Sequence, residues 1–174
     1  HFFRKFIFLT VFVTITSGFS IRAFTQTVTS TTAGGSWNTA STWVGGVVPA
    51  ASNDVTINGP VNLNGNFTCN NFTINSAGSI KNEWGWSPTF TVNGKFTNNG
   101  TVTKNPDGYS LYLKILGDIE NNGTWTPDQT YLSGNSDQNL KQASGKSFQG
   151  YFQTTDNVGK IVLGSDVTFI NNRW

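Results

Sequence analysis

The sequence predicts an all-β protein whose short strands stack as a parallel β-helix, with turns of about 23 residues. The main observation is a ten-residue pattern that occurs twice, as GKFTNNGTVT at 94–103 and as GDIENNGTWT at 117–126. Self-similarity at a fixed period of 20–50 residues is typical of repeat architectures. Short runs of alternating apolar and polar residues also recur from residue 55 onward. Charged residues make up only 11% of the chain, and Asn, Thr, Ser and Gly supply the polarity, which suits strands joined by tight corners.

Residues 1–25 have the pattern of a signal peptide. Arg4 and Lys5 form a positive start, an apolar core runs from Phe6 to Ile15, and Ser17-Gly18 provides a small-residue exit. A buried N-terminal strand is the alternative. The apolar run is too short for a membrane-spanning helix, which needs about 20 residues, so we expect no stable membrane span. We therefore expect a secreted protein, located outside the cell or on its surface.

Residues 26–54 are expected to form a polar lead-in and an N-terminal cap, with Trp37 and Trp43 packed inside the cap. Residues 55–174 are expected to form the turns of the solenoid. We also expect the sequence to be truncated at its C-terminus, because no capping segment follows the last strand pattern.

Residues 36–59 carry a resemblance to a known group of proteins. The motif consists of two tryptophans, Trp37 and Trp43, followed by Gly45-Gly46, Pro49 and the strand pattern at 54–57. It resembles the opening of secreted cell-surface proteins of the Bacteroidetes type that contain right-handed parallel β-helix domains, solenoids like those of pectate lyases. Residues 133–172 resemble turns from the same group. The resemblance implies a right-handed solenoid, and its motifs specify architecture rather than activity.

The turns from residue 55 onward are not all alike. Residues 65–68 and 164–168 are interpreted as weaker starts of the same repeat. Residues 81–90 are interpreted as a loop that bulges from one turn, and residues 104–110 as a second loop, because they contain a Pro-Asp-Gly turn signal. No helical periodicity is visible after the signal peptide.

Aligning the two copies of the repeat predicts which residues stack on successive turns. Phe96 should lie over Ile119 and Val102 over Trp125, all pointing inward. Asn98-Asn99 should stack on Asn121-Asn122 at a corner and form hydrogen bonds between turns. An antiparallel β-sandwich is the alternative fold, since it also uses short strands with frequent turns. It does not explain why both copies keep the same turn residues.

Several classes of chemistry find no support in the sequence. The only histidine is His1, Cys69 is the only cysteine and is expected to be buried, and the net charge is only +2. We therefore expect no catalytic centre, no cofactor, no metal site and no nucleic-acid partner. Asp118 and Glu120 share an outward face and are weak candidates for calcium; a solvated surface is the alternative reading of this pair.

The candidate binding residues are aromatic: Trp84, Trp86, Tyr109 and Tyr112. Trp84 and Trp86 lie two residues apart, so in an extended backbone both rings would face the same way. Two exposed indoles offer a flat apolar surface with N–H donors, which suits sugar rings. Tyr109 and Tyr112 would extend this surface if the two loops leave the same side of the solenoid. The alternative is that both tryptophans fold back as a lid over the core.

The function predicted from these features is that of a secreted or cell-surface structural module, adhesive and able to bind polysaccharide. The alternative is the N-terminal part of a carbohydrate-active enzyme, a polysaccharide lyase or glycoside hydrolase, whose catalytic site lies outside this sequence.

Overall fold

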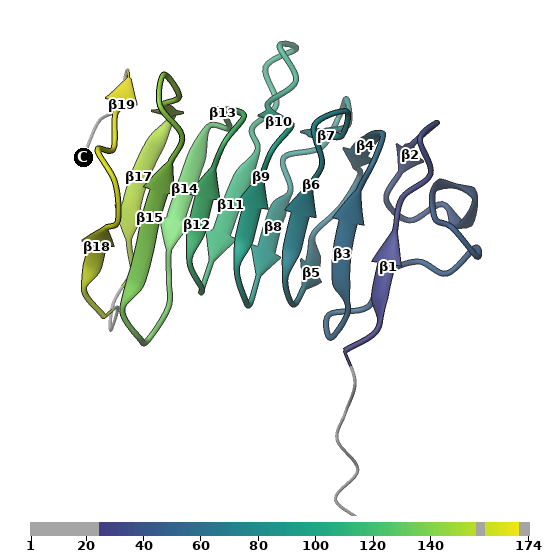
Figure 1. The fold of residues 1–174 in the computed structure, drawn as a ribbon. Helices are drawn as coiled ribbons and strands as arrows, with labels where there is room; N and C mark the ends of the chain where they lie inside the picture. Colours follow the sequence, from purple (N-terminus) through teal and green to yellow (C-terminus); the bar gives the residue numbers. More distant parts are fainter. Residues whose placement is uncertain (1–24, 156–158, 171–174) are drawn as a thin grey trace, which may run out of the picture.

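A computed structural model describes residues 25–155 and 159–170, and it shows a solenoid of parallel β-strands (Figure 1). All pairs of named strands in these residues are parallel; an isolated bridge between Ser30 and Trp43 is antiparallel. The solenoid is therefore confirmed, and the antiparallel sandwich is excluded. The predicted signal peptide lies outside the described residues except for Thr25.

Three parallel sheets form the sides of the solenoid. Sheet I consists of β1 (Thr27–Thr29), β3 (Asp54–Ile57), β6 (Phe72–Ile74), β9 (Phe96–Asn98), β12 (Ile119–Asn121), β15 (Gln138–Gln142) and β18 (Ile161–Leu163). Sheet II consists of β2 (Gly35–Ser36), β4 (Pro60–Leu63), β7 (Ser79–Asn82), β10 (Thr101–Thr103) and β13 (Thr124–Thr126). Sheet III consists of β5 (Phe67–Cys69), β8 (Thr89–Val92), β11 (Tyr112–Ile115), β14 (Gln129–Leu132) and β17 (Tyr151–Thr154). The side of sheet II continues in the pair β16 (Phe148–Gln149) and β19 (Phe169–Ile170), with β16 packed against β13.

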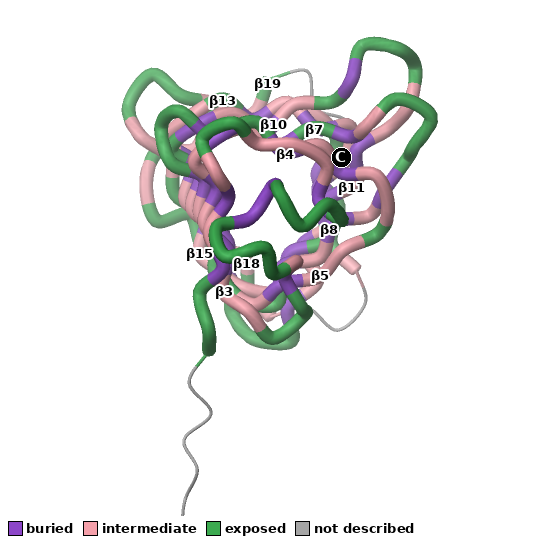
Figure 2. The backbone as a smooth tube through the Cα atoms, turned by 90° about the vertical axis from the view of Figure 1, so that its right-hand side faces the viewer, coloured by how far each residue is buried: buried purple, intermediate pink, exposed green. Residues whose placement is uncertain are grey.

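From β3 onward the chain visits sheets I, II and III in rotation, so each full turn contributes one strand to every sheet. In Figure 1 the chain rises along sheet I, crosses the top through sheet II and descends behind through sheet III while it advances to the left. This is a right-handed path. Seen along its axis, the backbone outlines a three-sided tube (Figure 2).

Inward-facing side chains stack from turn to turn and fill this tube. Phe96 pairs in register with Ile119, and Val102 pairs with Trp125, as the repeat predicted. All four are at most 1% exposed. Their rings also meet across the tube, with Phe96 and Trp125 at a centroid distance of 4.9 Å. Burying such large apolar side chains is the main stabilising contribution that this fold offers.

The asparagines of the repeat lie at the corner between sheets I and II. Asn98 and Asn121 are fully buried, and Nδ2 of Asn98 donates to Oδ1 of Asn121 at 2.9 Å. On the outside of the corner, Nδ2 of Asn122 donates to Oδ1 of Asn99 at 2.9 Å. The predicted stacking of both pairs is confirmed. Each buried amide also accepts a backbone N–H two residues later, from Gly100 or Gly123, so its polar atoms are satisfied within the corner.

The second glycine of each repeat is required for a close approach between turns. A Cβ atom on Gly123 would lie 2.1 Å from the carbonyl oxygen of Gly100, and one on Gly100 would lie 2.2 Å from the carbonyl oxygen of Gly78. Neither Gly100 nor Gly123 has a positive φ angle. The repeat therefore selects glycine for its small size, and not for the left-handed backbone that tight turns use.

The segment between β2 and β3 covers the N-terminal end of the tube (Figure 1) and includes a short 3-10 helix, Ala40–Thr42. Trp37 is fully buried and Trp43 is 2% exposed. Nε1 of Trp43 donates to the carbonyl of Trp37 at 2.7 Å, and the Trp37 ring stacks on Phe67 at 5.2 Å. These two tryptophans therefore close the core at this end.

Turn length varies, and this variation makes two sequence interpretations wrong. Phe96 pairs with Phe72, not with Phe67, so residues 65–68 are not a copy of the repeat start. Leu140 pairs with Leu163, so residues 164–168 follow the equivalent strand instead of containing it. The expected loop at 81–90 is shorter, because β7 extends to Asn82 and β8 begins at Thr89. Unequal corners shift the register away from a fixed period.

The core stacking predicts the effect of a buried charge. Exchanging Val102, which is fully buried, for Asp would place an unpaired carboxylate among apolar side chains. We expect Val102→Asp to cost about 3–5 kcal/mol, enough to unfold most of a protein of ordinary stability. Thermal unfolding by circular dichroism measures this, with Thr101→Asp on the outward side of the same strand as control. Equal melting temperatures would contradict the solenoid.

The glycine contacts predict that Gly123→Ala lowers the free energy of unfolding by about 1–3 kcal/mol, because the added methyl group would push two turns apart. Gly65→Ala is the matched control, since a Cβ there would meet only ordinary contacts at 3.5 Å or more. Urea denaturation of both variants measures the difference. A Gly123 variant as stable as the control would show that the corner has room to relax.

Candidate functional site

Two loops on adjacent turns define the candidate site. Residues 83–88 connect β7 to β8, and residues 104–111 connect β10 to β11, so both loops leave the solenoid at the corner between sheets II and III. Figure 1 shows the second loop rising above the upper edge of the solenoid. The two loops therefore leave the same side of the solenoid, which was the condition for Tyr109 to extend the tryptophan surface.

A buried asparagine holds both loops in place. Asn82 ends β7 with its side chain fully buried. Its Nδ2 donates to the carbonyl of Trp86 at 2.9 Å, and its Oδ1 accepts the N–H of Asn105 at 2.7 Å. Oγ of Ser87 also accepts the N–H of Ser110 at 3.1 Å. The loops are thus joined to each other and to the edge of the core.

A carboxylate from the following turn fixes both ends of loop 104–111. Oδ1 of Asp128 accepts a hydrogen bond from Nζ of Lys104 at 2.9 Å, and its Oδ2 accepts the N–H of Leu111 at 2.8 Å. Lys104 is the first residue of the loop and Leu111 is the last. Hydrogen bonds to a charged group are stronger than neutral ones, so Asp128 holds both ends of loop 104–111 in position.

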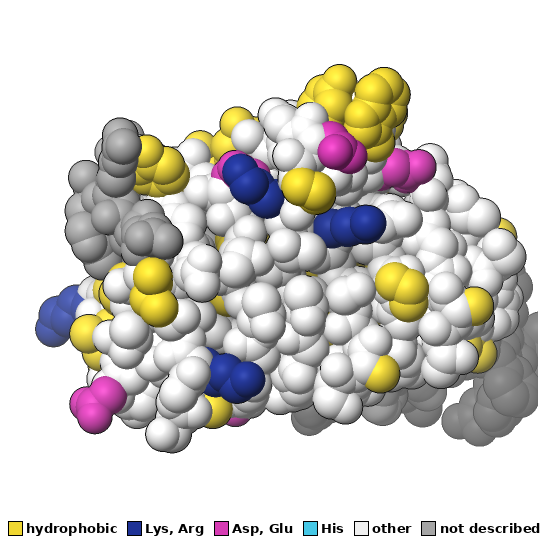
Figure 3. Space-filling model, turned by 90° about the horizontal axis from the view of Figure 1, so that it is seen from above, with side chains coloured by type: hydrophobic (Ala, Val, Ile, Leu, Met, Phe, Trp, Pro, Cys, Tyr) yellow, Lys and Arg dark blue, Asp and Glu magenta, His cyan; other side chains and the backbone are white. Residues whose placement is uncertain are grey.

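The two tryptophans of the first loop face solvent. Trp84 is 67% exposed and Trp86 is 50% exposed, so the alternative of a lid over the core is wrong. The backbone between the two tryptophans is not extended: the N–H of Trp86 bonds to the carbonyl of Glu83 at 3.1 Å, and Gly85 has a φ of +85°. This tight turn projects the side chains away from the core. Hydrophobic side chains stand out beside acidic ones in Figure 3.

The structure brings together some of the predicted aromatic residues and separates another. Trp84 and Tyr109 meet edge to face, with ring centroids 5.9 Å apart and an interplanar angle of 72°. Trp86 lies two residues further along the same loop, and its ring does not contact the ring of Trp84. Tyr112 lies in β11, paired with Thr89 and Gln129, and its ring has no aromatic partner within the described residues. We use the term aromatic platform for Trp84, Trp86 and Tyr109.

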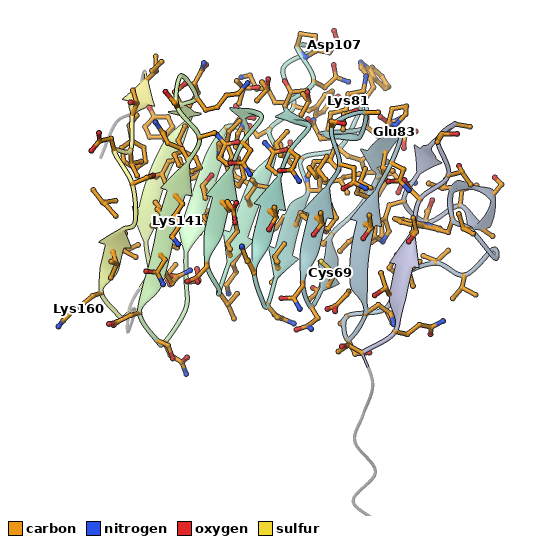
Figure 4. All side chains as sticks on the ribbon, in the orientation of Figure 1. Cys69, Lys81, Glu83, Asp107, Lys141 and Lys160 are labelled. Atoms are coloured by element: carbon orange, nitrogen blue, oxygen red, sulfur yellow. The ribbon has the colours of Figure 1, made fainter. Side chains whose placement is uncertain are left out.

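Charged residues of both signs lie close in sequence to the aromatic platform. Lys81 and Glu83 come shortly before Trp84, and Asp107 before Tyr109. All three lie along the upper edge of the solenoid, with Asp107 in loop 104–111 (Figure 4). Oε2 of Glu83 accepts a hydrogen bond from Oγ of Ser36 at 2.9 Å. Because both signs of charge are present, these residues provide hydrogen-bonding groups beside the platform without creating a strong electrostatic field of either sign.

The predicted calcium pair is engaged in other contacts. Oδ1 of Asp118 accepts the N–H of Asn139 at 2.8 Å. Glu120 accepts hydrogen bonds from Lys95 and from Asn122, and these bonds, that of Lys95 first, lower the pKa of its carboxyl. No group of three or more His, Cys, Asp or Glu among the described residues is arranged to hold a metal ion.

Cys69 is fully buried in β5. Burial, with a smaller contribution from the charge of Asp54, raises the pKa of its thiol. The thiol therefore stays protonated near neutral pH and acts as a small apolar side chain, as the sequence predicted.

The sequence interpretation missed the residues that hold the loops in place. A usable signal was present, because each pair repeats one residue type at the period of the solenoid, 23 residues: Asn82 with Asn105, and Ser87 with Ser110. The same spacing links Asn98 to Asn121 in the core. Asp128 carries no such signal, since its partners lie 24 and 17 residues away.

Comparisons of the whole chain with protein-family models, with curated proteins and with solved structures find no match. Among the residues that the structure describes, no helix has the length and apolar character to cross a membrane. The architecture itself therefore defines the class: a right-handed parallel β-solenoid with two anchored loops at one corner.

The anchoring by Asn82 generates a prediction. Asn82→Leu keeps the side-chain volume but leaves the carbonyl of Trp86 and the N–H of Asn105 without their partner. We expect the free energy of unfolding to fall by about 1–3 kcal/mol. We also expect faster hydrogen exchange at the amide of Asn105. Asn93→Leu, at an exposed position, is the control; equal exchange in both variants would contradict the anchoring role.

Proposed function

We propose that this protein is a secreted or cell-surface structural module that attaches to polysaccharide through its aromatic platform. The observation that carries the proposal is the exposure of two large indoles on a loop that is itself held in place by Asn82. The side chains of Trp84 and Trp86 are each at least 50% exposed, although burying their apolar surface would stabilise the fold. Exposed aromatic side chains on a rigid base are typical of binding surfaces.

The chemistry of the platform suits a carbohydrate. The apolar C–H faces of sugar rings pack on aromatic rings, and hydroxyl groups require nearby donors and acceptors. The carboxylates of Glu83 and Asp107 and the indole N–H groups would provide these hydrogen bonds. Anchoring by Asn82 reduces the entropy that would be lost when the loops order around a ligand.

Two features of the sequence support a location outside the cell. Residues 1–25 have the pattern of an export signal, and residues 36–59 resemble the opening of secreted β-helix proteins of the Bacteroidetes type. An extended, repetitive solenoid with few charges would serve as a rigid spacer that displays the platform.

A glycan-array screen of purified residues 26–174 tests this proposal. The wild-type protein should bind one class of polysaccharide, and the Trp84→Ala, Trp86→Ala double variant should lose at least about tenfold in affinity, since two aromatic contacts are removed. The double variant should keep the wild-type melting temperature, because both side chains are largely exposed.

The matched control is the double variant Val44→Ala, Val47→Ala, which removes two exposed apolar side chains, 63% and 52% exposed, from the N-terminal cap. It should bind like the wild type. A folded wild-type protein that binds no glycan, or a tryptophan variant that binds equally well, would overturn the proposal.

A further inference from the structure

A groove adjoins the aromatic platform on the C-terminal side of loop 104–111. It has a volume of about 510 Å³, within the range of ligand pockets. Three successive turns contribute to it, and the lining residues that bear on its ligand are Thr103, Lys104, Thr126, Asp128, Gln149 and Tyr151. Loop 104–111 borders both regions, because its Pro106 lines the groove while its Tyr109 contacts Trp84.

The polar groups of the groove repeat once per turn. Thr103, Thr126 and Gln149 follow each other at intervals of 23 residues on the side of sheet II. Oγ1 of Thr126 donates to Oγ1 of Thr103 at 3.0 Å, and Gln149 continues the column from β16, which packs against β13. Hydrogen-bonded strands lie about 4.8 Å apart, which is close to the length of one pyranose unit in an extended glycan. Each turn can therefore meet one sugar unit with one polar side chain.

The charges of the groove cancel. Lys104 and Asp128 are its only lining residues with a formal charge, and they form an ion pair with Nζ and Oδ1 at 2.9 Å. A polyanionic ligand would have to compete with Asp128 for the lysine. An uncharged ligand with many hydroxyl groups would instead add hydrogen bonds to both partners of the pair.

The far end of the groove carries a further aromatic ring. Tyr151 is 43% exposed, and its hydroxyl has no hydrogen-bond partner within the part of the chain that the structure describes. It lies three turns beyond Trp84, because Trp84 precedes β8 and Tyr151 begins β17. Three steps of about 4.8 Å place the two rings on the order of 14 Å apart along the solenoid axis.

We propose that the groove is a second subsite, which holds an extended, uncharged polysaccharide strand running from the aromatic platform to Tyr151, parallel to the solenoid axis. This inference rests on the proposed function and adds the class of ligand. Thr103, Thr126 and Gln149 meet successive sugar units, and Tyr151 stacks on the last one. Short ligands occupy the platform alone, whereas ligands of four or more units also fill the groove.

Titration calorimetry with neutral β-1,4-linked probes of two lengths, cellobiose with cellohexaose and mannobiose with mannohexaose, tests the subsite. In one of these pairs the wild-type protein should bind the hexasaccharide at least about tenfold more tightly than the disaccharide. Tyr151→Ala should remove most of that gain and leave the disaccharide affinity unchanged. Tyr151→Phe should retain the gain, because the ring remains. Tyr131→Ala, on sheet III outside the groove, is the control and should bind like the wild type.

The other outcomes separate this inference from the proposed function. If Tyr151→Ala and the wild type bind the hexasaccharide equally while the Trp84→Ala, Trp86→Ala variant loses binding, the platform stands and the subsite is overturned. If the wild type binds none of the probes, the subsite is overturned for neutral β-1,4 glycans; an empty glycan array would also overturn the proposed function. Hexagalacturonate is the charged probe: tighter binding of it, or affinity that falls with added salt, would overturn the assignment to an uncharged ligand.

Discussion

The fixed distance between hydrogen-bonded turns is the constraint on which the rest of this structure depends. Parallel strands lie about 4.8 Å apart, and a side chain that points between two turns at a corner must fit within that spacing. Gly100 and Gly123 are required because their neighbours on the preceding turn leave no room for a Cβ atom. Asn98 and Asn121 fill the inside of the same corner and replace the hydrogen bonds that the backbone cannot make there. Size and hydrogen-bonding capacity together explain the repeated Asn-Asn-Gly.

The same constraint decides where binding residues can be placed. Core side chains occupy the inward-facing positions, and the strand backbones are engaged in hydrogen bonds between turns. Additional residues can therefore be inserted only at the corners. Both loops of the candidate site lie at one corner, and their anchors obey the spacing of the turns, as Asn82 and Asn105 show. The groove follows the same rule, with Thr103 and Thr126 stacked in register. Platform and groove are thus products of the repeat.

Residues that repeat in the sequence could be placed from the sequence, and residues that break the repeat could not. The stacks of Phe96 on Ile119 and of Val102 on Trp125 followed from one alignment, because both turns have the same length. Residues 65–68 and 164–168 were misplaced, since corners of unequal length shift the register without changing the strand pattern. Whether Trp84 faces solvent or folds back over the core was left open by the sequence. It depends on a tight turn at Gly85 and on contacts with the next loop, which periodicity does not encode.

The hold of Asp128 on loop 104–111 bears on how such a protein can change over evolutionary time. The carboxylate of Asp128 on the next turn accepts hydrogen bonds from both Lys104 and Leu111. The positions of the two ends of the loop therefore do not depend on the residues at its tip. Substitutions or insertions between those two points would leave the core and its register intact. New specificities can therefore arise at this corner by exchange of the tip alone, in the way that antibody domains vary their loops on a constant framework.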